Sequence, residues 1–400
     1  MALSNFGVRI KQEKKLWLHR LEVRCQKSDV RSQMSEVRCR KSDVRSQLCP
    51  LFLPQGILWT VLCSLLSVLL SSCAGPLAVD PVFEARTAIE SADAAMGDWE
   101  GSWKLEDESD SGPVVTQVIA LGKGKYRANV LGEFDTREEP MVVLEGRRDG
   151  AAVRFEGQAE LSDGGTLEIQ AAIENGKFNG RFEGDEIGSF EMERVIRVSP
   201  TLGAEPPAGA IVLFNGKNFK QWKHTRKKPG DDSVQWKLLK GGAMEVKKGT
   251  GSIVTKKKFA DFKLHVEFRT PFMPDARGQA RGNSGVYLQE RYEVQVLDSY
   301  ALEGKDNECG GIYKIGAPLV NMCAPPTQWQ TYDITFYAPG ADKGNARVTV
   351  VHNGVTIHDN ISLPKPTGGA LDSDVTKAGG IYLQDHGNPV QYRNIWLIEL

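Results

Sequence analysis

The second half of the chain alternates apolar and polar residues with a period of two. Residues 262–269 (FKLHVEFR) place apolar side chains on one face of a strand and polar or charged side chains on the other. Residues 348–358 contain two further segments of this kind around Asn353-Gly354, a dipeptide typical of a two-residue hairpin turn. Residues 211–400 show no helical period of useful length. This pattern predicts a two-sheet jelly roll of antiparallel strands.

A second group of short alternating segments comes earlier, in residues 98–197. Segments such as 114–119 and 153–157 recur every 8–12 residues, a spacing that predicts a small antiparallel barrel or sandwich. Residues 82–97 predict one short amphipathic helix in front of it. The sequence GDWEGSW at 97–103 is similar to the start of lipocalin-like barrels. No catalytic constellation is visible in this region.

The first 50 residues lack the apolar periodicity that a core requires. Residues 22–33 and 36–47 are two copies of one 12-residue sequence that differ at a single position. Two copies are too few for a solenoid, so we interpret the segment as a translated upstream repeat behind a misplaced start codon. A genuine basic extension is the alternative. We assign this segment no function.

An uncharged apolar run follows at residues 57–72. It is shorter than the roughly 20 residues that a membrane-spanning helix needs, and small residues follow it, as in a signal peptide. The sequence LSSC at 70–73 resembles the bacterial lipobox. This resemblance implies lipidation of Cys73, export, and a place in the periplasm or at the outer membrane, with the lipid as the only membrane anchor. An ordinary secretory signal with a chance cysteine is the alternative.

Charge is distributed unevenly along the chain. Residues 1–73 hold 12 Lys and Arg against 5 Asp and Glu, whereas residues 74–400 hold 38 against 46. An acidic body argues against nucleic acid as a partner, because nucleic-acid binding needs a basic footprint.

Together these patterns predict an all-β protein, in which a concanavalin-like jelly-roll sandwich follows a smaller antiparallel β barrel or sandwich. Residues 199–209 (SPTLGAEPPAG) have the composition of a semi-stiff linker between the two. The predicted regions are an unstructured extension (1–50), a lipoprotein signal (51–73), a small lipocalin-like domain (82–198), the linker (199–209) and the sandwich (210–400).

Only two cysteines follow Cys73, namely Cys309 and Cys323. In an exported protein they could form a disulfide, which would close a loop of about 15 residues and contribute about 3 kcal/mol. Two unpaired buried thiols are the alternative. Neither cysteine has a second Cys or His at the close spacing of a metal site.

Six ordered segments of the C-terminal region resemble the 3-keto-disaccharide hydrolase domain family, which has a concanavalin-like fold. They are LFNGKNFKQW (213–222), RGNSGVYL (281–288), YEVQVLDS (292–299), GIY (311–313), WQTYD (329–333) and LQDHGNPV (383–390). The resemblance covers nearly all of 210–400 and does not extend to 74–200. It implies a carbohydrate substrate, oxidised at C3 of the sugar. No nucleotide-binding fingerprint is visible, so a separate sugar 3-dehydrogenase would supply that substrate.

Residues 293–298 (EVQVLD) carry the candidate acids. On a regular strand Glu293 and Gln295 share one face and Asp298 lies on the other, unless a one-residue bulge returns it. Laminarinase-type glycosidases of the same fold use E-x-D-x-x-E at this spacing, and Gln295 replaces the middle acid here. This departure argues against a conventional glycosidase on unmodified glucans, which needs two carboxylates about 5 Å apart.

A ketone at C3 permits a different reaction, which needs one well-placed base. The base removes the C2 proton, the C1 leaving group is expelled, and water adds to the enone. We expect Glu293, Asp298 and His386 to be catalytic. The residues expected to bind sugar hydroxyls are Gln295, Asn283, Lys314, Arg393 and Glu267. A divalent cation such as calcium is possible, with Glu267, Glu293 and Asp298 as its ligands.

Each assignment has a structural alternative. Glu267 could merely pair with neighbouring charges, His386 could fix a turn-rich loop, and Lys314 and Arg393 could be plain surface charges. A lectin-like carbohydrate-binding module without turnover is the second functional hypothesis, because the same polar face would serve it.

Overall fold

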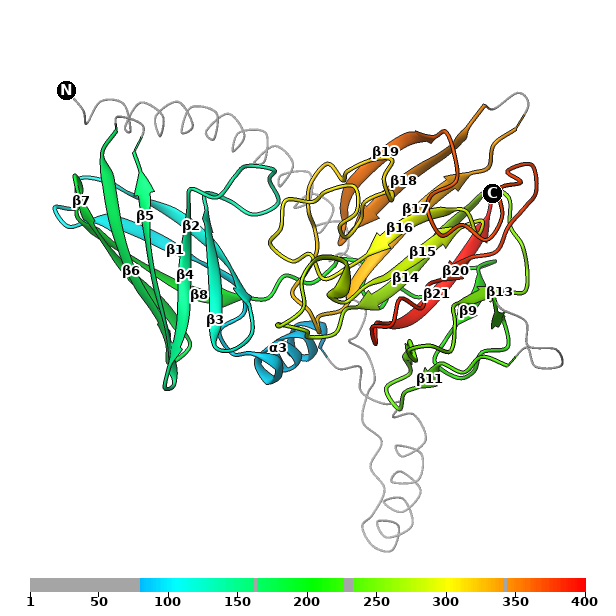
Figure 1. Cartoon of the computed structure of the whole chain (residues 1–400), viewed down its shortest axis with the longest axis horizontal. Coiled ribbons are helices and arrows are strands. Elements are labelled where there is room, and N and C mark those ends of the chain that lie inside the picture. Colours follow the sequence, from blue (N-terminus) through cyan, green and yellow to red (C-terminus); the bar gives the residue numbers. More distant parts are fainter. Residues whose placement is uncertain (1–79, 162–163, 226–232, 341–343) are drawn as a thin grey trace, which may run out of the picture. The chain divides into compact units, whose positions relative to one another are not determined.

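The computed structural model describes four stretches of the chain, residues 80–161, 164–225, 233–340 and 344–400 (Figure 1). The predictions for residues 1–73, including lipidation of Cys73, lie outside these stretches. Asp80–Ala159 and Thr166–Leu400 form one compact unit. No helix among the described residues is long and apolar enough to cross a membrane.

The helix in the structure is shorter than the apolar pattern of the sequence predicted. Helix α3 spans Pro81–Ala92 rather than 82–97. Asp80 caps its start, because its side chain accepts a hydrogen bond from the backbone amide of Val82 at 2.9 Å. The helix ends where Asp93 adopts an extended backbone conformation.

Eight antiparallel strands form a closed barrel. They are β1 (Gly97–Leu105), β2 (Ser111–Ala120), β3 (Lys125–Leu131), β4 (Val142–Asp149), β5 (Ala152–Glu160), β6 (Thr166–Glu174), β7 (Lys177–Gly184) and β8 (Gly188–Val195). Pairing of β1 with β8 closes the barrel, which removes the free sheet edges (Figure 1). Aromatic rings pack in its core, where the Phe178 ring lies within 5.8 Å of Trp99, Phe155 and Phe190.

Two antiparallel sheets form the C-terminal sandwich. The smaller sheet has the order β10 (Trp222–His224), β13 (Ile253–Thr255), β20 (Tyr382–Leu383), β15 (Ser284–Leu288) and β16 (Tyr292–Val296). The larger sheet has the order β11 (Lys237–Leu238), β12 (Met244–Glu245), β21 (Gln391–Glu399), β14 (Phe262–Arg269), β17 (Gln330–Tyr337), β18 (Ala346–His352) and β19 (Val355–Leu363), and β9 (Ile211–Phe214) also pairs with β21. The predicted all-β class is confirmed.

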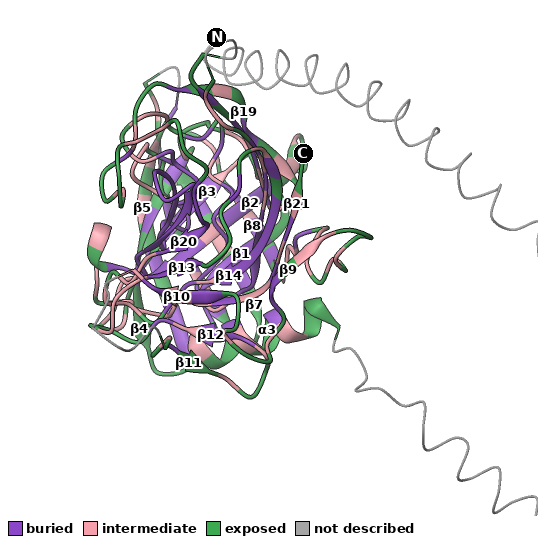
Figure 2. Ribbon diagram, turned by 90° about the vertical axis from the view of Figure 1, so that its right-hand side faces the viewer, coloured by how far each residue is buried: buried purple, intermediate pink, exposed green. Residues whose placement is uncertain are grey.

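The two sheets share one apolar core. Leu264 and Val266 from β14 are buried in the same cluster as Val286 from β15 and Val294 from β16. Figure 2 colours most of β14 as buried. Because side chains alternate along a strand, the residues between these apolar positions lie on the outer face of each sheet. Those two outer faces carry most of the predicted site residues.

Candidate functional site

Glu293 lies on the outer face of the smaller sheet. Its partner across the β15–β16 pair is Tyr287, and both residues alternate with core residues of their strands. The Glu293 side chain is buried, with the residue 3% exposed. Burial raises the pKa of its carboxyl to about 8, although a hydrogen bond with Tyr287 acts in the opposite direction. A carboxyl that titrates near neutral pH can both accept and release a proton during a reaction.

Gly285 makes room for that carboxylate. A Cβ atom at position 285 would overlap Oε1 of Glu293. Gln295 lies directly opposite Gly285 on β16, and the backbone amide of Gln384 donates to the carbonyl of Gly285 at 3.0 Å from the other side. Gly285, which has no side chain, is therefore surrounded by residues with polar side chains. We call this group the Gly285 site; its members are Asn283, Gly285, Tyr287, Glu293, Gln295 and Gln384.

Gln279, outside the group, orients two of its amide side chains, and Tyr287, a member of the group, orients the third. Nδ2 of Asn283 donates to the backbone and side-chain oxygens of Gln279 at 2.9 and 3.0 Å, and Nε2 of Gln295 donates to the same side-chain oxygen at 3.3 Å. The hydroxyl of Tyr287 donates to the carbonyl of Gly368 at 2.9 Å and accepts from Nε2 of Gln384 at 3.2 Å. Each amide is therefore held by its nitrogen.

The amide oxygens of Asn283 and Gln384 are unused. Both atoms are buried and have no hydrogen-bond partner among the described residues. A buried acceptor without a partner costs about 1–3 kcal/mol, so hydroxyl groups of a ligand would be favourable partners. This property fits carbohydrate recognition.

Asp298 is separated from this site. Strand β16 ends at Val296, and the β15–β16 register is continuous, so no bulge returns Asp298 to the face of Glu293. Its buried carboxylate accepts a hydrogen bond from Arg281 at 2.6 Å. Burial raises the pKa of Asp298, and Arg281 partly offsets that rise. The structure therefore gives Asp298 a structural ion pair and does not bring it together with Glu293.

Lys314 and His386 are exposed and lie on loops next to the site. Lys314 follows Tyr313, whose backbone amide donates to the carbonyl of Glu293 at 3.2 Å, and its ammonium lies 5.8 Å from the centre of the Tyr313 ring. His386 follows Gln384 by two residues, in the turn between β20 and β21. Among the described residues, neither side chain forms a hydrogen bond or ion pair with Glu293, so the roles of both stay predictions.

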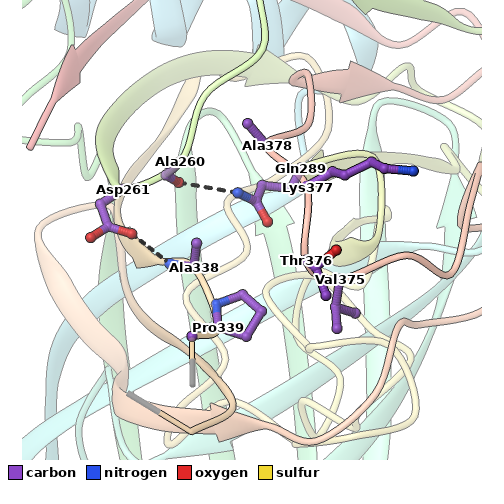
Figure 3. A pocket seen from close by; sticks show the side chains of 10 residues that line it. Ala260, Asp261, Gln289, Ala338, Pro339, Val375, Thr376, Lys377 and Ala378 are labelled. Carbon is purple, nitrogen blue, oxygen red and sulfur yellow. Dashed lines mark hydrogen bonds between the residues drawn. The ribbon is translucent and has the colours of Figure 1, made fainter. Parts of the chain in front are cut away.

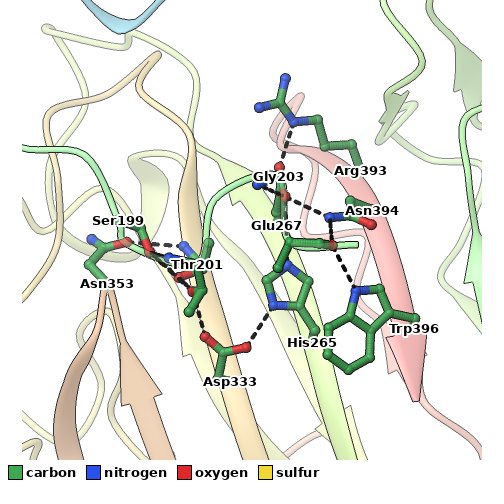
Figure 4. Close-up of polar contacts among 12 residues, drawn as sticks. Ser199, Thr201, Gly203, His265, Glu267, Asp333, Asn353, Arg393, Asn394 and Trp396 are labelled. Atoms are coloured by element: carbon green, nitrogen blue, oxygen red, sulfur yellow. Dashed lines mark hydrogen bonds and ion pairs between the residues drawn. The ribbon is translucent and has the colours of Figure 1, made fainter. Parts of the chain in front are cut away.

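Glu267 and Arg393 lie on the other sheet (Figure 4). Nε of Arg393 donates to Oε2 of Glu267 at 2.6 Å, and Oε1 accepts from the backbone amide of Gly203 at 2.7 Å and from Nδ2 of Asn394 at 2.8 Å. Burial alone would raise the pKa of Glu267, but hydrogen bonds from His265, Asn394 and Arg393 lower it to about 2. This carboxylate is saturated with donors and holds the linker against the sheet.

His265 extends the same network, and the sequence analysis assigned it no role. Its Nδ1 lies 2.6 Å from Asp333, whose other carboxylate oxygen accepts from the Thr201 hydroxyl at 2.6 Å (Figure 4). Burial lowers the pKa of His265, but hydrogen bonds with Asp333 and Glu267 outweigh burial and raise it overall. The structure thus places Glu267 and Arg393 in a network that holds the linker against the larger sheet, and their sugar-binding role stays a prediction.

The possible metal ligands also lie apart. Glu267 is on the larger sheet, Glu293 on the smaller one, and Asp298 is paired with Arg281. The described residues contain no group of three or more His, Cys, Asp or Glu side chains that could hold a metal ion. Cys309 and Cys323 are buried free thiols, which corresponds to the alternative to a disulfide.

A cavity of about 360 Å³ lies elsewhere in the sandwich (Figure 3). Its polar lining groups already serve the fold. The side chain of Gln289 donates to the carbonyls of Phe259 and Ala260 at 2.9 and 3.3 Å, and Asp261 accepts from the backbone amide of Ala338 at 2.8 Å. None of the predicted site residues lines this cavity.

Comparison with known proteins identifies the sandwich. Residues 209–398 match the model of one family, described as the 3-keto-alpha-glucoside-1,2-lyase-like domain. Residues 209–398 belong to this family. The Gly285 site, with all six of its residues, lies within this lyase-like domain. No curated protein matches the chain.

Solved structures include similar proteins. Two from Parabacteroides distasonis ATCC 8503 are each described as a "putative glycosyl hydrolase". The first is 38% identical, covers 48% of this chain and 85% of its own, and has a TM-score of 0.43. The second is 21% identical, covers 48% and 94%, and has a TM-score of 0.35. Fatty-acid-binding protein 1 of Echinococcus granulosus is 14% identical, covers 26% and 99%, and has a TM-score of 0.18. The family match supports a glycoside hydrolase-like function for the lyase-like domain.

Tyr287 and Gln384 were not predicted as site residues. A signal was available, because Asn283, Gly285 and Tyr287 are alternate residues, and alternate residues of an extended segment share one face. The sequence could not show that Gln384 lies beside Gly285, since 100 residues of chain separate Ser284 from Gln384.

Proposed function

We propose that the lyase-like domain cleaves glycosides whose sugar carries a ketone at C3, with Glu293 as the proton-transferring residue. The observation that carries this proposal is the buried carboxyl of Glu293, which has its pKa raised to about 8 and packs closely against Gly285. The name of the matching family, the 3-keto-alpha-glucoside-1,2-lyase-like domain, supports a 3-keto glycoside as the substrate class. The unused amide oxygens of the Gly285 site support a ligand rich in hydroxyl groups.

One carboxyl is sufficient for the proposed bond cleavage. The carboxylate of Glu293 takes the C2 proton, and the electrons of that C–H bond form an enolate with the C3 ketone. The enolate then expels the oxygen on C1, and the protonated Glu293 returns the proton to that oxygen. Atoms and charge balance without a second carboxylate, which agrees with the separate position of Asp298. Addition of water to the resulting enone would complete hydrolysis.

The pKa of Glu293 suits both halves of this reaction. A carboxylate with a raised pKa is a stronger base than an ordinary one, and its protonated form is still acidic enough to donate to an alkoxide. Tyr287 keeps its proton, because burial and the charge of Glu293 raise the pKa of its phenol. It therefore serves as a hydrogen-bond donor in the site and not as a base.

A carbohydrate-binding module without turnover is the second candidate. The three amide side chains of the Gly285 site would serve binding alone. A module that only binds has no use for a carboxyl that titrates near neutral pH, and that property favours the enzyme.

The test is incubation of the full chain with a 3-keto glucoside and with its unoxidised parent, each with and without a chelator. We expect release of the leaving group from the 3-keto glucoside only. Binding of the parent glucoside without cleavage of either compound would favour the module, and equal cleavage of both would contradict the elimination. Loss of cleavage with the chelator would add a metal ion to the site.

We also propose that the chain is exported as a lipoprotein through residues 51–73, and that a separate sugar 3-dehydrogenase supplies its substrate. The lipobox-like sequence at 70–73 supports the first proposal. Labelled palmitate should enter the wild type but not Cys73→Ala.

A further inference from the structure

Gln384 is a member of the Gly285 site and has no role in the proposed reaction. Its backbone amide donates to Gly285 at 3.0 Å, and its side-chain Nε2 donates to the hydroxyl of Tyr287 at 3.2 Å. Its Oε1 is buried and has no partner among the described residues. One end of this amide is therefore held, and the other end is unused.

The hydroxyl of Tyr287 determines which end is unused. It has one proton and two acceptors close to it, the carbonyl of Gly368 at 2.9 Å and the carboxyl of Glu293. The phenol can therefore offer Gln384 only a lone pair. The Gln384 amide must turn its nitrogen toward Tyr287, which leaves the carbonyl free. This orientation follows from the count of donors and acceptors.

Asn283 repeats the arrangement on the neighbouring strand. Its Nδ2 donates to two oxygens of Gln279, and its Oδ1 is buried without a partner among the described residues. Asn283 directly precedes β15 and Gln384 directly follows β20, and these two strands are paired. Two unused acceptors thus lie close to Gly285, against which the carboxylate of Glu293 packs.

Building on the proposed function, we propose that Gln384 is a specificity-determining residue, whose carbonyl accepts a hydrogen bond from one hydroxyl group of the oxidised sugar ring. Tyr287 is the positioning residue that turns the amide. A sugar that lacks this hydroxyl leaves the carbonyl buried and unpaired, and a site built to pair with a hydroxyl rejects such an analogue.

The experiment compares three proteins on four substrates. The proteins are the full-length wild type, Gln384→Met and, as a matched control, Gln391→Met. Gln391 is a partly buried glutamine on the other sheet with both amide ends occupied, since Oε1 accepts from Arg269 and Nε2 donates to Glu245, each at 2.7 Å. The substrates are a 3-keto glucoside and its 2-deoxy, 4-deoxy and 6-deoxy analogues.

We expect Gln384→Met to lower kcat/KM on the parent 3-keto glucoside roughly tenfold, the value of one good hydrogen bond, and Gln391→Met to leave it unchanged. On one of the three deoxy analogues the wild type and Gln384→Met should be equal, because the hydroxyl that the carbonyl reads is missing. An equal loss on all four substrates would overturn the inference. Gln384→Ala repeats the comparison if Gln384→Met does not fold.

The outcome separates this inference from the proposed function. If the wild type cleaves no 3-keto glucoside, the proposed function is wrong, and the same proteins are then compared by calorimetric binding of glucose-based glycosides and their deoxy forms. A difference in affinity between wild type and Gln384→Met that vanishes for one deoxy form would still support a hydrogen bond between Gln384 and one sugar hydroxyl. A difference that persists for every form would overturn it.

Discussion

Two buried glutamates on opposite faces of the sandwich have opposite acid–base properties. Glu267 and Glu293 are 0% and 3% exposed, yet the pKa of the first is lowered to about 2 and the pKa of the second is raised to about 8. Burial acts in the same direction on both. The difference lies in the donors, because Glu267 meets Arg393, Asn394, His265 and a backbone amide. Among the described residues, Glu293 faces one phenol, that of Tyr287, whose single proton is also directed toward the carbonyl of Gly368.

This comparison separates a glutamate that serves structure from one that we propose to serve chemistry. A carboxylate that is fully paired is held in its charged form and has no tendency to take up a proton. A carboxyl that is desolvated without compensation is costly for the fold, and such sites are characteristic of function. The following substitutions test whether the contrast between Glu267 and Glu293 is real.

The largest expected effect is on activity. Glu293→Gln keeps the shape of the side chain but cannot transfer a proton, so kcat on a 3-keto glucoside should fall about 10²–10⁴-fold, as for loss of a general acid–base group. The exposed Glu399, which pairs with Lys257 on the surface, provides the control; Glu399→Gln should keep full activity. Undiminished cleavage by Glu293→Gln would rule out its proposed role.

The next effect is on stability. Glu267→Gln removes the charge that Arg393 and the linker amide of Gly203 share, and breaking a buried pair of this kind costs about 3 kcal/mol. Thermal unfolding should show a melting temperature lower by roughly 6–12 °C, given the usual 2–4 °C per kcal/mol for a domain of this size. A shift of less than about 1 °C would mean that the clasp does not hold the linker.

A smaller effect on activity is expected at Gly285. Gly285→Ala adds a Cβ that overlaps Oε1 of Glu293, so the carboxylate must move. Displacement of a catalytic group by about 1 Å costs up to about 10²-fold in rate, with little loss of stability because the carboxylate end is free to shift. Gly241→Ala, at a glycine with open space around it, is the control. Full activity of Gly285→Ala would show that close packing against Gly285 does not position Glu293.

The last effect is the pH dependence of stability. The folded pKa of Glu293, about 8, exceeds its ordinary value of 4.5, so its contribution is fully present below about pH 4.5 and is lost as the pH rises toward 8. Glu267 acts in reverse, because its contribution is present above about pH 4.5 and is lost as the pH falls toward 2. Melting temperatures of wild type and Glu293→Gln should therefore diverge between pH 5 and 8, with the wild type declining more. Parallel curves would contradict the raised pKa.

The sequence predicts the sheets well and the site in part. Alternation along 262–269 and around Asn353-Gly354 is a local property of strands, and both segments form strands in the sandwich. The same parity correctly places Glu293 and Gln295 on one face. The extent of helix α3 was predicted too long, since an apolar pattern does not show where the backbone leaves the helix.

The failures concern contacts between distant parts of the chain. Glu267 and Glu293 are both acids on strands, and no local pattern shows that Arg393, Asn394 and Gly203 surround only the first. The role of Asp298 depended on a bulge, and the strand ends before one could form. Charge partners are set by tertiary packing, which spacing along the chain does not encode.

The most direct test is a titration of the two glutamates themselves. Carbon-13 NMR of protein labelled at the glutamate side-chain carboxyls, with Glu293→Gln and Glu267→Gln for assignment, reports the pKa of each group. We predict that the signal lost in Glu293→Gln titrates near pH 8, and that the signal lost in Glu267→Gln stays in its ionised position down to about pH 3. A midpoint of 4 to 5 for Glu293 would contradict the account, because an ordinary carboxyl at that position would leave the Gly285 site without its base.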